Sequence, residues 1–168
     1  LETAVAWRAA IERTEGPTSL ILSRQNLPQQ EGAPARAEHA DLGGYVLAEA
    51  EDGGKPDVVL IATGSEVMLA MQARAQLAAR SIKARVVSMP STSVFDAQDA
   101  AYRASVLPAG TKRVAIEAGS RESWWRYVGL DGAVIGMDTF GASAPAKKLF
   151  EHFGFTAANV ARVGAGLL

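Results

Sequence analysis

Residues 57–80 read DVVLIATGSEVMLAMQARAQLAAR, and this stretch decides the fold. Its first part, residues 57–62, is a continuous apolar run bounded by Pro56 and Gly64. Such a run predicts a strand buried on both faces. Because a helical pattern follows it at once, the stretch predicts the first half of a βαβ unit.

The turn between them, TGSE at residues 63–66, matches a capping box. In this motif the Thr63 hydroxyl and the Glu66 carboxylate would bond free backbone amides at the helix start. The helix is predicted to run to about Arg80, with a polar stripe and an apolar stripe roughly opposite. The polar stripe consists of Gln72, Gln76 and Arg80, and the apolar one of Val67, Met71, Ala75 and Ala78.

Further strands and helices alternate along the rest of the chain. The patterns predict strands over 44–47, 85–89 and 114–117, and helices over 95–105, 145–153 and 157–163. Strands separated by helix-length segments imply right-handed crossovers and a mainly parallel sheet covered by helices on both faces. The fold class expected is therefore α/β, a three-layer α/β/α sandwich with a mainly parallel, mixed sheet.

The first 41 residues have a different organisation. Residues 3–13 predict a short helix ended by Gly16 and Pro17, and residues 18–23 (TSLILS) predict a strand buried on both faces. No neighbouring strands precede it here, so we expect residues 1–27 to be the end of another domain. Residues 28–41, with two prolines and no large apolar side chain before Leu42, predict a linker, and 42–168 a complete domain.

Composition limits the function classes. The chain has 168 residues, 48% of them hydrophobic, a net charge of −1 and no cysteine. The absence of cysteine excludes disulfides and thiol nucleophiles. The net charge near zero gives no electrostatic reason to expect a nucleic acid or a membrane as partner. We expect a cytoplasmic location. The start at Leu1 rather than a methionine favours a piece of a longer protein.

Several other residues are candidates for function. The ATGSE turn could hold an anion or be an ordinary capped turn, and Glu117 ends a buried strand where ligands often bind in parallel sheets. His39 and His152 lack metal-ligand spacing, so no metal site is predicted. The aromatic residues of ESWWRYVG, namely Trp124, Trp125 and Tyr127, favour core or interface packing over ligand stacking.

Arg24 is the candidate binding residue. It comes just after the predicted strand 18–23 and is flanked by Ser23, Gln25 and Asn26. A guanidinium in this place could bind a phosphate through paired hydrogen bonds. The alternative is a salt bridge that holds the linker, and spacing alone does not separate the two.

Six runs, in order and at matching separations, resemble transketolases along nearly the whole chain. They are ETAVAW, LILSRQNLPQQ, IATGSEV, ARVVSMPSTSVFDAQDAAYRASVLP, VAIEAG and GMDTFGASAPAKKLFEHFGFTAANV. The SMPST and FDxQDxxYRxSVLP pattern resembles transketolase proper rather than deoxyxylulose phosphate synthases or 2-oxo acid dehydrogenase beta chains. The EGAPARAEHAD and SRESWWR stretches match no family motif.

The resemblance implies a homodimeric enzyme of the pentose phosphate pathway. Such enzymes use thiamine diphosphate and a divalent cation, Mg or Ca, to move a two-carbon ketol unit from a ketose phosphate to an aldose phosphate. Residues 1–27 would end the pyrimidine-binding domain, and 42–168 would form the carboxy-terminal domain. Arg24 would help to bind the sugar phosphate.

The resemblance assigns no catalytic, cofactor or metal residue to this chain, so we expect the isolated chain to be inactive. A rival interpretation is a free-standing α/β module for binding or dimerisation, without catalysis. The unpaired segment 3–23 argues against it, because an independent module has little reason to keep a buried strand without its sheet.

Overall fold

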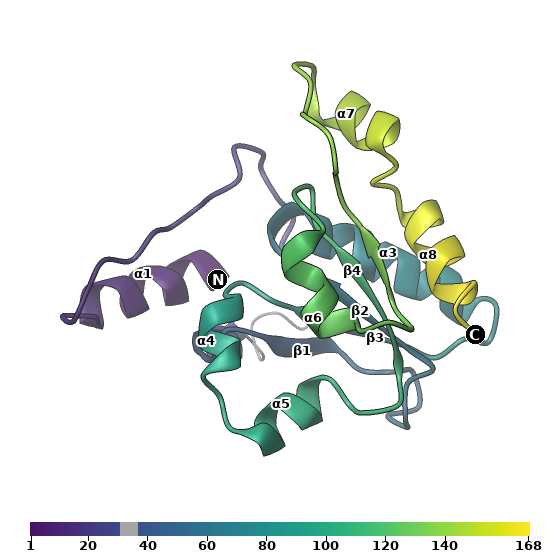
Figure 1. The fold of residues 1–168 in the computed structure, drawn as a ribbon, viewed down its shortest axis with the longest axis horizontal. Coiled ribbons are helices and arrows are strands. Elements are labelled where there is room, and N and C mark those ends of the chain that lie inside the picture. The colour runs from purple at the N-terminus through teal and green to yellow at the C-terminus, as the bar shows by residue number, and fades with distance from the viewer. Residues whose placement is uncertain (31–36) are drawn as a thin grey trace.

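The computed structural model describes residues 1–30 and 37–168, and within them five strands form one sheet in the order β1-β3-β2-β4-β5 (Figure 1). Their bounds are Tyr45–Ala48 for β1, Val58–Ala62 for β2, Ala84–Ser88 for β3, Lys112–Ile116 for β4 and Ala133–Ile135 for β5. Only β1 runs antiparallel to its neighbour. The predicted α/β class with a mainly parallel, mixed sheet is confirmed.

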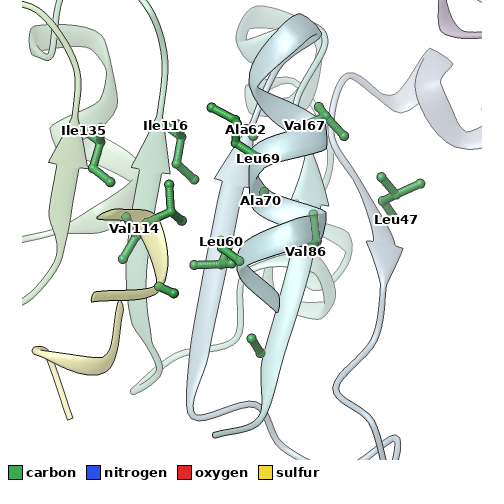
Figure 2. Close-up of a cluster of buried hydrophobic side chains, with 14 of the residues drawn as sticks. Leu47, Leu60, Ala62, Val67, Leu69, Ala70, Val86, Val114, Ile116 and Ile135 are labelled. Atoms are coloured by element: carbon green, nitrogen blue, oxygen red, sulfur yellow. The ribbon is translucent and has the colours of Figure 1, made fainter. Parts of the chain in front are cut away.

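Both faces of the sheet are covered by helices, because alternate residues of each strand point to opposite sides. On one face Val58, Leu60 and Ala62 of β2 belong to a core shared with α3 (Val67–Ala78) and α8 (Ala157–Ala165). Figure 2 shows this cluster, with Leu69 and Ala70 of α3 over the sheet. The second core includes Val59 and Ile61 on the other face, and it is closed by three short helices. These are α4 (Thr92–Asp96), α5 (Ala100–Val106) and α6 (Trp125–Val128).

Two predicted helices differ in detail from the structure. The helix predicted over 95–105 is wrong as one element, because α4 ends at Asp96 and α5 begins at Ala100. Asp99 starts the second helix by accepting a hydrogen bond from the Tyr102 amide at 2.7 Å. The predicted apolar stripe of α3 is wrong in part. Val67 is buried and Met71 packs partly buried against the core, but Ala75 is exposed. The other buried residues of the helix are Leu69, Ala70, Ala73 and Leu77. Alanine on most faces gave too little contrast to identify the buried side. The predicted polar stripe is confirmed, since Gln72, Gln76 and Arg80 are all exposed.

The amino-terminal segment contains the predicted helix but not the predicted strand. Helix α1 (Glu2–Glu12) forms, and it has no buried residue. The strand predicted over 18–23 is wrong: the backbone has no strand there and Ile21 is 95% exposed. A strand needs a hydrogen-bonded neighbour, and the described residues provide none for this segment. In Figure 1 this purple segment extends away from the sheet.

The remaining elements are short or peripheral. They are α7 (Ala146–Phe153) and the 3-10 helices η1 (Ala37–Leu42), η2 (Gly64–Glu66) and η3 (Glu122–Trp124). The centre of the predicted linker, 31–36, lies outside the described residues. Strand β5 was not predicted, because three residues between glycines give no strand pattern. No helix among residues 1–30 and 37–168 combines the length and apolar character needed to cross a membrane.

Candidate functional site

The centre of the sheet contains a topological switch point between β2 and β4. The chain passes from β2 to β3 on one side of β2, while β4 lies on the other side. Crossover connections therefore leave β2 and β4 in opposite directions, and ligands of open parallel sheets bind at the carboxyl ends of such strands. Two carboxyl groups meet at this edge, Glu66 after β2 and Glu117 after β4.

Glu66 is the more buried carboxyl group, with 3% of the residue exposed. Its carboxylate accepts a hydrogen bond from the Ser65 hydroxyl at 2.7 Å and another from the backbone of Ala118, just past β4. Burial raises the pKa of Glu66, although these hydrogen bonds oppose the rise. Glu66 therefore connects the ends of β2 and β4.

The predicted capping box is wrong for the side chains. Thr63 has extended backbone before η2, as an N-cap should, but its hydroxyl caps no amide. The amide of Glu66 bonds instead to the Thr63 carbonyl at 3.1 Å. The pattern S/T-x-x-E is typical of a capping box, so the sequence interpretation missed Glu66 as a buried group. The available signal was its position in the short turn that follows the buried strand β2.

Glu117 lies at the end of β4, where the sequence placed it. Burial raises the pKa of Glu117 to about 7, and the nearby negative charge of Glu66 adds to the rise. No hydrogen bond or ion pair joins its side chain to any residue in the described parts of the chain. A carboxyl group with such a pKa exchanges its proton near neutral pH, so this edge of the sheet changes charge there.

Arg24 lies in the exposed segment after α1. It borders an open depression of about 600 Å³ together with Leu22, Gln25 and residues at the start of α7, including Ala146. It forms no ion pair with a described residue, so the alternative of a salt bridge that holds the linker has no support among residues 1–30 and 37–168. The guanidinium is available to an anion or to another part of the protein.

The other candidates divide between core and surface. Trp124 and Tyr127 are buried with ring centroids 5.8 Å apart, as expected for core packing, whereas Trp125 is 42% exposed. His39 lies on η1, and His152 meets the edge of Phe153 in α7. The described residues contain no group of three or more His, Asp or Glu side chains placed to hold a metal ion.

The residues at the switch point do not suit thiamine diphosphate with a divalent cation. The diphosphate is an anion, and the two carboxyl groups of this edge would repel it. A hard cation takes about six oxygen ligands, and the described part of the chain brings no three carboxylates together. We therefore assign no step through this cofactor to the residues described.

A family model and similar known proteins point to the same protein family. The family model for the transketolase-like TK C-terminal domain matches residues 43–156. Transketolase 1 of Escherichia coli is 57% identical over the whole chain, as is Transketolase 1 of Vibrio parahaemolyticus. The chain spans about a quarter of the length of these relatives, since it covers 25% of each.

Solved structures agree with the sequence comparison. Transketolase from Leishmania mexicana superposes with a TM-score of 0.90 at 42% identity, covering 99% of this chain and 23% of that one. A transketolase from Pichia stipitis in complex with sedoheptulose-7-phosphate gives the same values. The chain therefore belongs to the transketolase family, and residues 43–156 form its transketolase-like C-terminal domain.

Proposed function

We propose that this chain is the carboxy-terminal part of a transketolase, which transfers a two-carbon ketol unit from a ketose phosphate to an aldose phosphate. The observation that carries the proposal is 57% identity over the whole chain to Transketolase 1 of Escherichia coli. The reaction would belong to the pentose phosphate pathway, in the cytoplasm. Thiamine diphosphate and a Mg or Ca ion would be bound by parts of the protein outside this chain.

The proposed division of the chain follows from the same relatives. Residues 1–27 would end the pyrimidine-binding domain, 28–41 would be a linker, and 42–168 would form the carboxy-terminal domain. The family match beginning at residue 43 supports the last boundary. The apolar side chains exposed on the first segment, among them Trp7 and Ile21, support burial against a part of the protein absent here.

Arg24 is proposed to bind the phosphate of the sugar substrate. Its exposed guanidinium has no partner among the described residues, and one solved relative is a complex with a sugar phosphate. A planar fork of N–H donors matches the oxygens of a phosphate. The proposed enzyme is a homodimer.

A chimaera tests the proposal directly. The matching quarter of Escherichia coli Transketolase 1 is replaced by this chain, and ketol transfer is measured with thiamine diphosphate and Mg²⁺. Activity near that of the parent is expected, while the isolated chain should show no turnover. A folded chimaera without activity, or turnover by the isolated chain, would overturn the proposal and favour the alternative of a non-catalytic binding or dimerisation module.

The same chimaera tests Arg24. Arg24→Ala removes hydrogen bonds to a charged group, each about 1.5–3 kcal/mol, so KM for a phosphorylated acceptor should rise about 10-fold or more. KM for an acceptor without a phosphate should stay unchanged. Arg13→Ala is the matched control, because Arg13 is also exposed in the amino-terminal segment. Equal losses with both acceptors would contradict a phosphate-binding role.

A further inference from the structure

A cavity of about 440 Å³ opens at the carboxyl edge of the sheet, beside the switch point. Its walls come from the segments that follow three adjacent parallel strands: Thr63 after β2, Ser91 after β3, and Glu117 after β4. Residues of the loop from Gly119 to Trp124 line another side, and the cavity is wide open to solvent. The cavity therefore has the position in which open α/β sheets bind their ligands.

The charge of the cavity is negative. Glu117 is the one ionisable group among the described residues of the wall, and no lysine, arginine or histidine lines it. Glu66 faces Glu117 from the β2 side and adds a second carboxyl group. The neighbouring Arg121 is paired with Asp138 at 3.1 Å, so it does not neutralise Glu117. An anionic ligand is disfavoured, and a cationic one would gain electrostatic energy.

Hydroxyl groups supply the polar part of the wall. Within the described chain the Thr63 and Ser123 hydroxyls form no hydrogen bond, so both can donate to or accept from a ligand. The Ser91 and Ser120 hydroxyls accept from the amides of Val94 and Glu122. The Ser120 hydroxyl keeps its proton to donate, whereas the Ser91 hydroxyl shares a hydrogen bond with the Ser93 hydroxyl at 3.3 Å. This wall suits a ligand with several N–H or O–H groups.

The indole of Trp124 supplies the apolar part. It is 4% exposed and held by Tyr127 at 5.8 Å between ring centroids. The carbon atoms of an organic ammonium ion would gain apolar contact with this part of the wall, which also includes Met89 and Pro90. A bare metal ion has no carbon atoms to gain such contact, and it would find only one carboxylate in this wall.

We propose that this cavity binds a small organic ammonium ion that carries hydroxyl groups, with Glu117 opposite the ammonium and Thr63, Ser123 and Trp124 around it. The inference goes beyond ketol transfer and does not depend on it. It assigns to the carboxy-terminal domain a ligand of its own, chosen by charge, hydroxyl groups and an apolar part of the wall.

Tryptophan fluorescence provides the test. Trp7→Phe and Trp125→Phe together remove the two exposed indoles and leave Trp124 as the only reporter. Titration of this chain with ethanolamine should give a saturable change in emission at constant ionic strength. Potassium chloride, glycerol and inorganic phosphate are the comparison probes. No saturable change with ethanolamine, or the same change with potassium ions or glycerol, would overturn the proposal.

A matched pair of variants assigns the site. Glu117→Gln should weaken ethanolamine binding about 10-fold or more, because a neutral amide replaces the charge opposite the ammonium. Glu122→Gln, a nearby exposed glutamate outside the cavity wall, should leave binding unchanged. Calorimetric titration provides a readout independent of fluorescence, and urea unfolding confirms that each variant is folded. Equal binding by both variants would refute the assignment.

The pH dependence adds an independent readout. Protons compete with a cation for the Glu117 carboxylate, so affinity should rise between about pH 6 and pH 8 as the group, with a pKa of about 7, loses its proton. Glu66, the other carboxyl group at this edge, also has a raised pKa and acts in the same direction. An affinity that falls over this range would contradict ammonium binding.

Discussion

The carboxylate of Glu2 accepts a hydrogen bond from the hydroxyl of Tyr45 at 2.8 Å, which joins the start of α1 to the edge strand of the sheet. The Ser88 hydroxyl of β3 donates to the same oxygen at 2.6 Å. Burial raises the pKa of Tyr45, and the Glu2 carboxylate adds to the rise. This carboxylate thus holds the start of α1 against two strands. The helix has two further contacts, an ion pair between Arg8 and Asp41 at 3.5 Å and packing of Val5 against the core.

Glu2→Ala should release α1 from the sheet. Tyr45 and Ser88 would lose their shared acceptor, at a cost of about 1–3 kcal/mol for each buried donor left unpaired. Limited cleavage by trypsin after Arg13 or Arg24 should become several-fold faster. Mass spectrometry of the fragments over time measures the rate. Glu12→Ala, at the other end of α1 and without a described hydrogen bond, should cleave like the unmodified chain. Equal rates for both variants would show that α1 is held by other contacts.

Glu117 should make the stability of the domain depend on pH. The folded carboxyl holds its proton up to about pH 7, whereas the unfolded one releases it near 4.5. Between these values the folded state binds more protons, so the free energy of unfolding should fall as pH rises. Because the group is partly exposed and screened, the loss should be about 1–2 kcal/mol.

Glu117→Gln should remove most of this loss, since an amide does not titrate. Urea unfolding at about pH 5 and pH 8 measures it, and the variant should gain stability mainly at the higher pH. In this variant Glu66 should still make the free energy of unfolding fall with rising pH, to a smaller extent, because its pKa is raised as well. Glu122→Gln should retain the full dependence, and a variant that is stabilised equally at both pH values would refute the explanation.

Arg113 joins the ends of two helices to β4. Its guanidinium donates to the carbonyl of Tyr127 at 2.7 Å and to those of Leu107 and Pro108 at 3.0 Å each. Arg113→Met would leave these carbonyls unpaired and should lower the free energy of unfolding by roughly 2–4 kcal/mol. Arg103→Met is the control, since this exposed side chain makes one long contact of 3.4 Å to the Asp96 carbonyl. Urea unfolding of both variants should show a clear difference.

Gly43 occupies a position that only glycine fits. Its φ is +83°, and an added Cβ would lie 2.3 Å from the amide nitrogen of Phe95 and 2.5 Å from the Ser91 carbonyl oxygen. Gly43→Ala should therefore cost more than about 3 kcal/mol, the left-handed strain of about 1–2 kcal/mol plus the clash. Gly53→Ala has a similar φ of +67° with nothing within 4 Å, so only the strain should remain. Equal costs in thermal unfolding would show that the backbone at Gly43 moves aside.

Local patterns were sufficient for the elements at the centre of the sheet. The apolar runs of β2 and β3 exceed what a half-exposed strand carries, and the structure buries all five residues of β2. The position of Glu117 at a strand end also followed from the pattern. These features depend only on residues that are neighbours in the sequence, so they can be predicted from the sequence alone.

Features that depend on contacts with other parts of the structure could not be predicted from local patterns. The apolar run over 18–23 satisfies every local criterion for a buried strand, yet the described chain offers it no neighbour to pair with. The break between α4 and α5 depended on whether the Asp99 side chain turned back to an amide. The side of α3 that became buried was set by packing against the sheet and against α8, which is distant in sequence.

The sequence by itself determined the α/β class, the positions of the central strands along the chain and the kinship with transketolases, because apolar periodicity and motif spacing are properties of the chain alone. The tertiary structure decided which charged groups meet. Glu66 and Glu117 are 51 positions apart and carry no signal of pairing, and they interact because β2 and β4 are neighbours in the sheet. The energy of a charge depends on its burial and its neighbours, and those exist only once the strands are side by side.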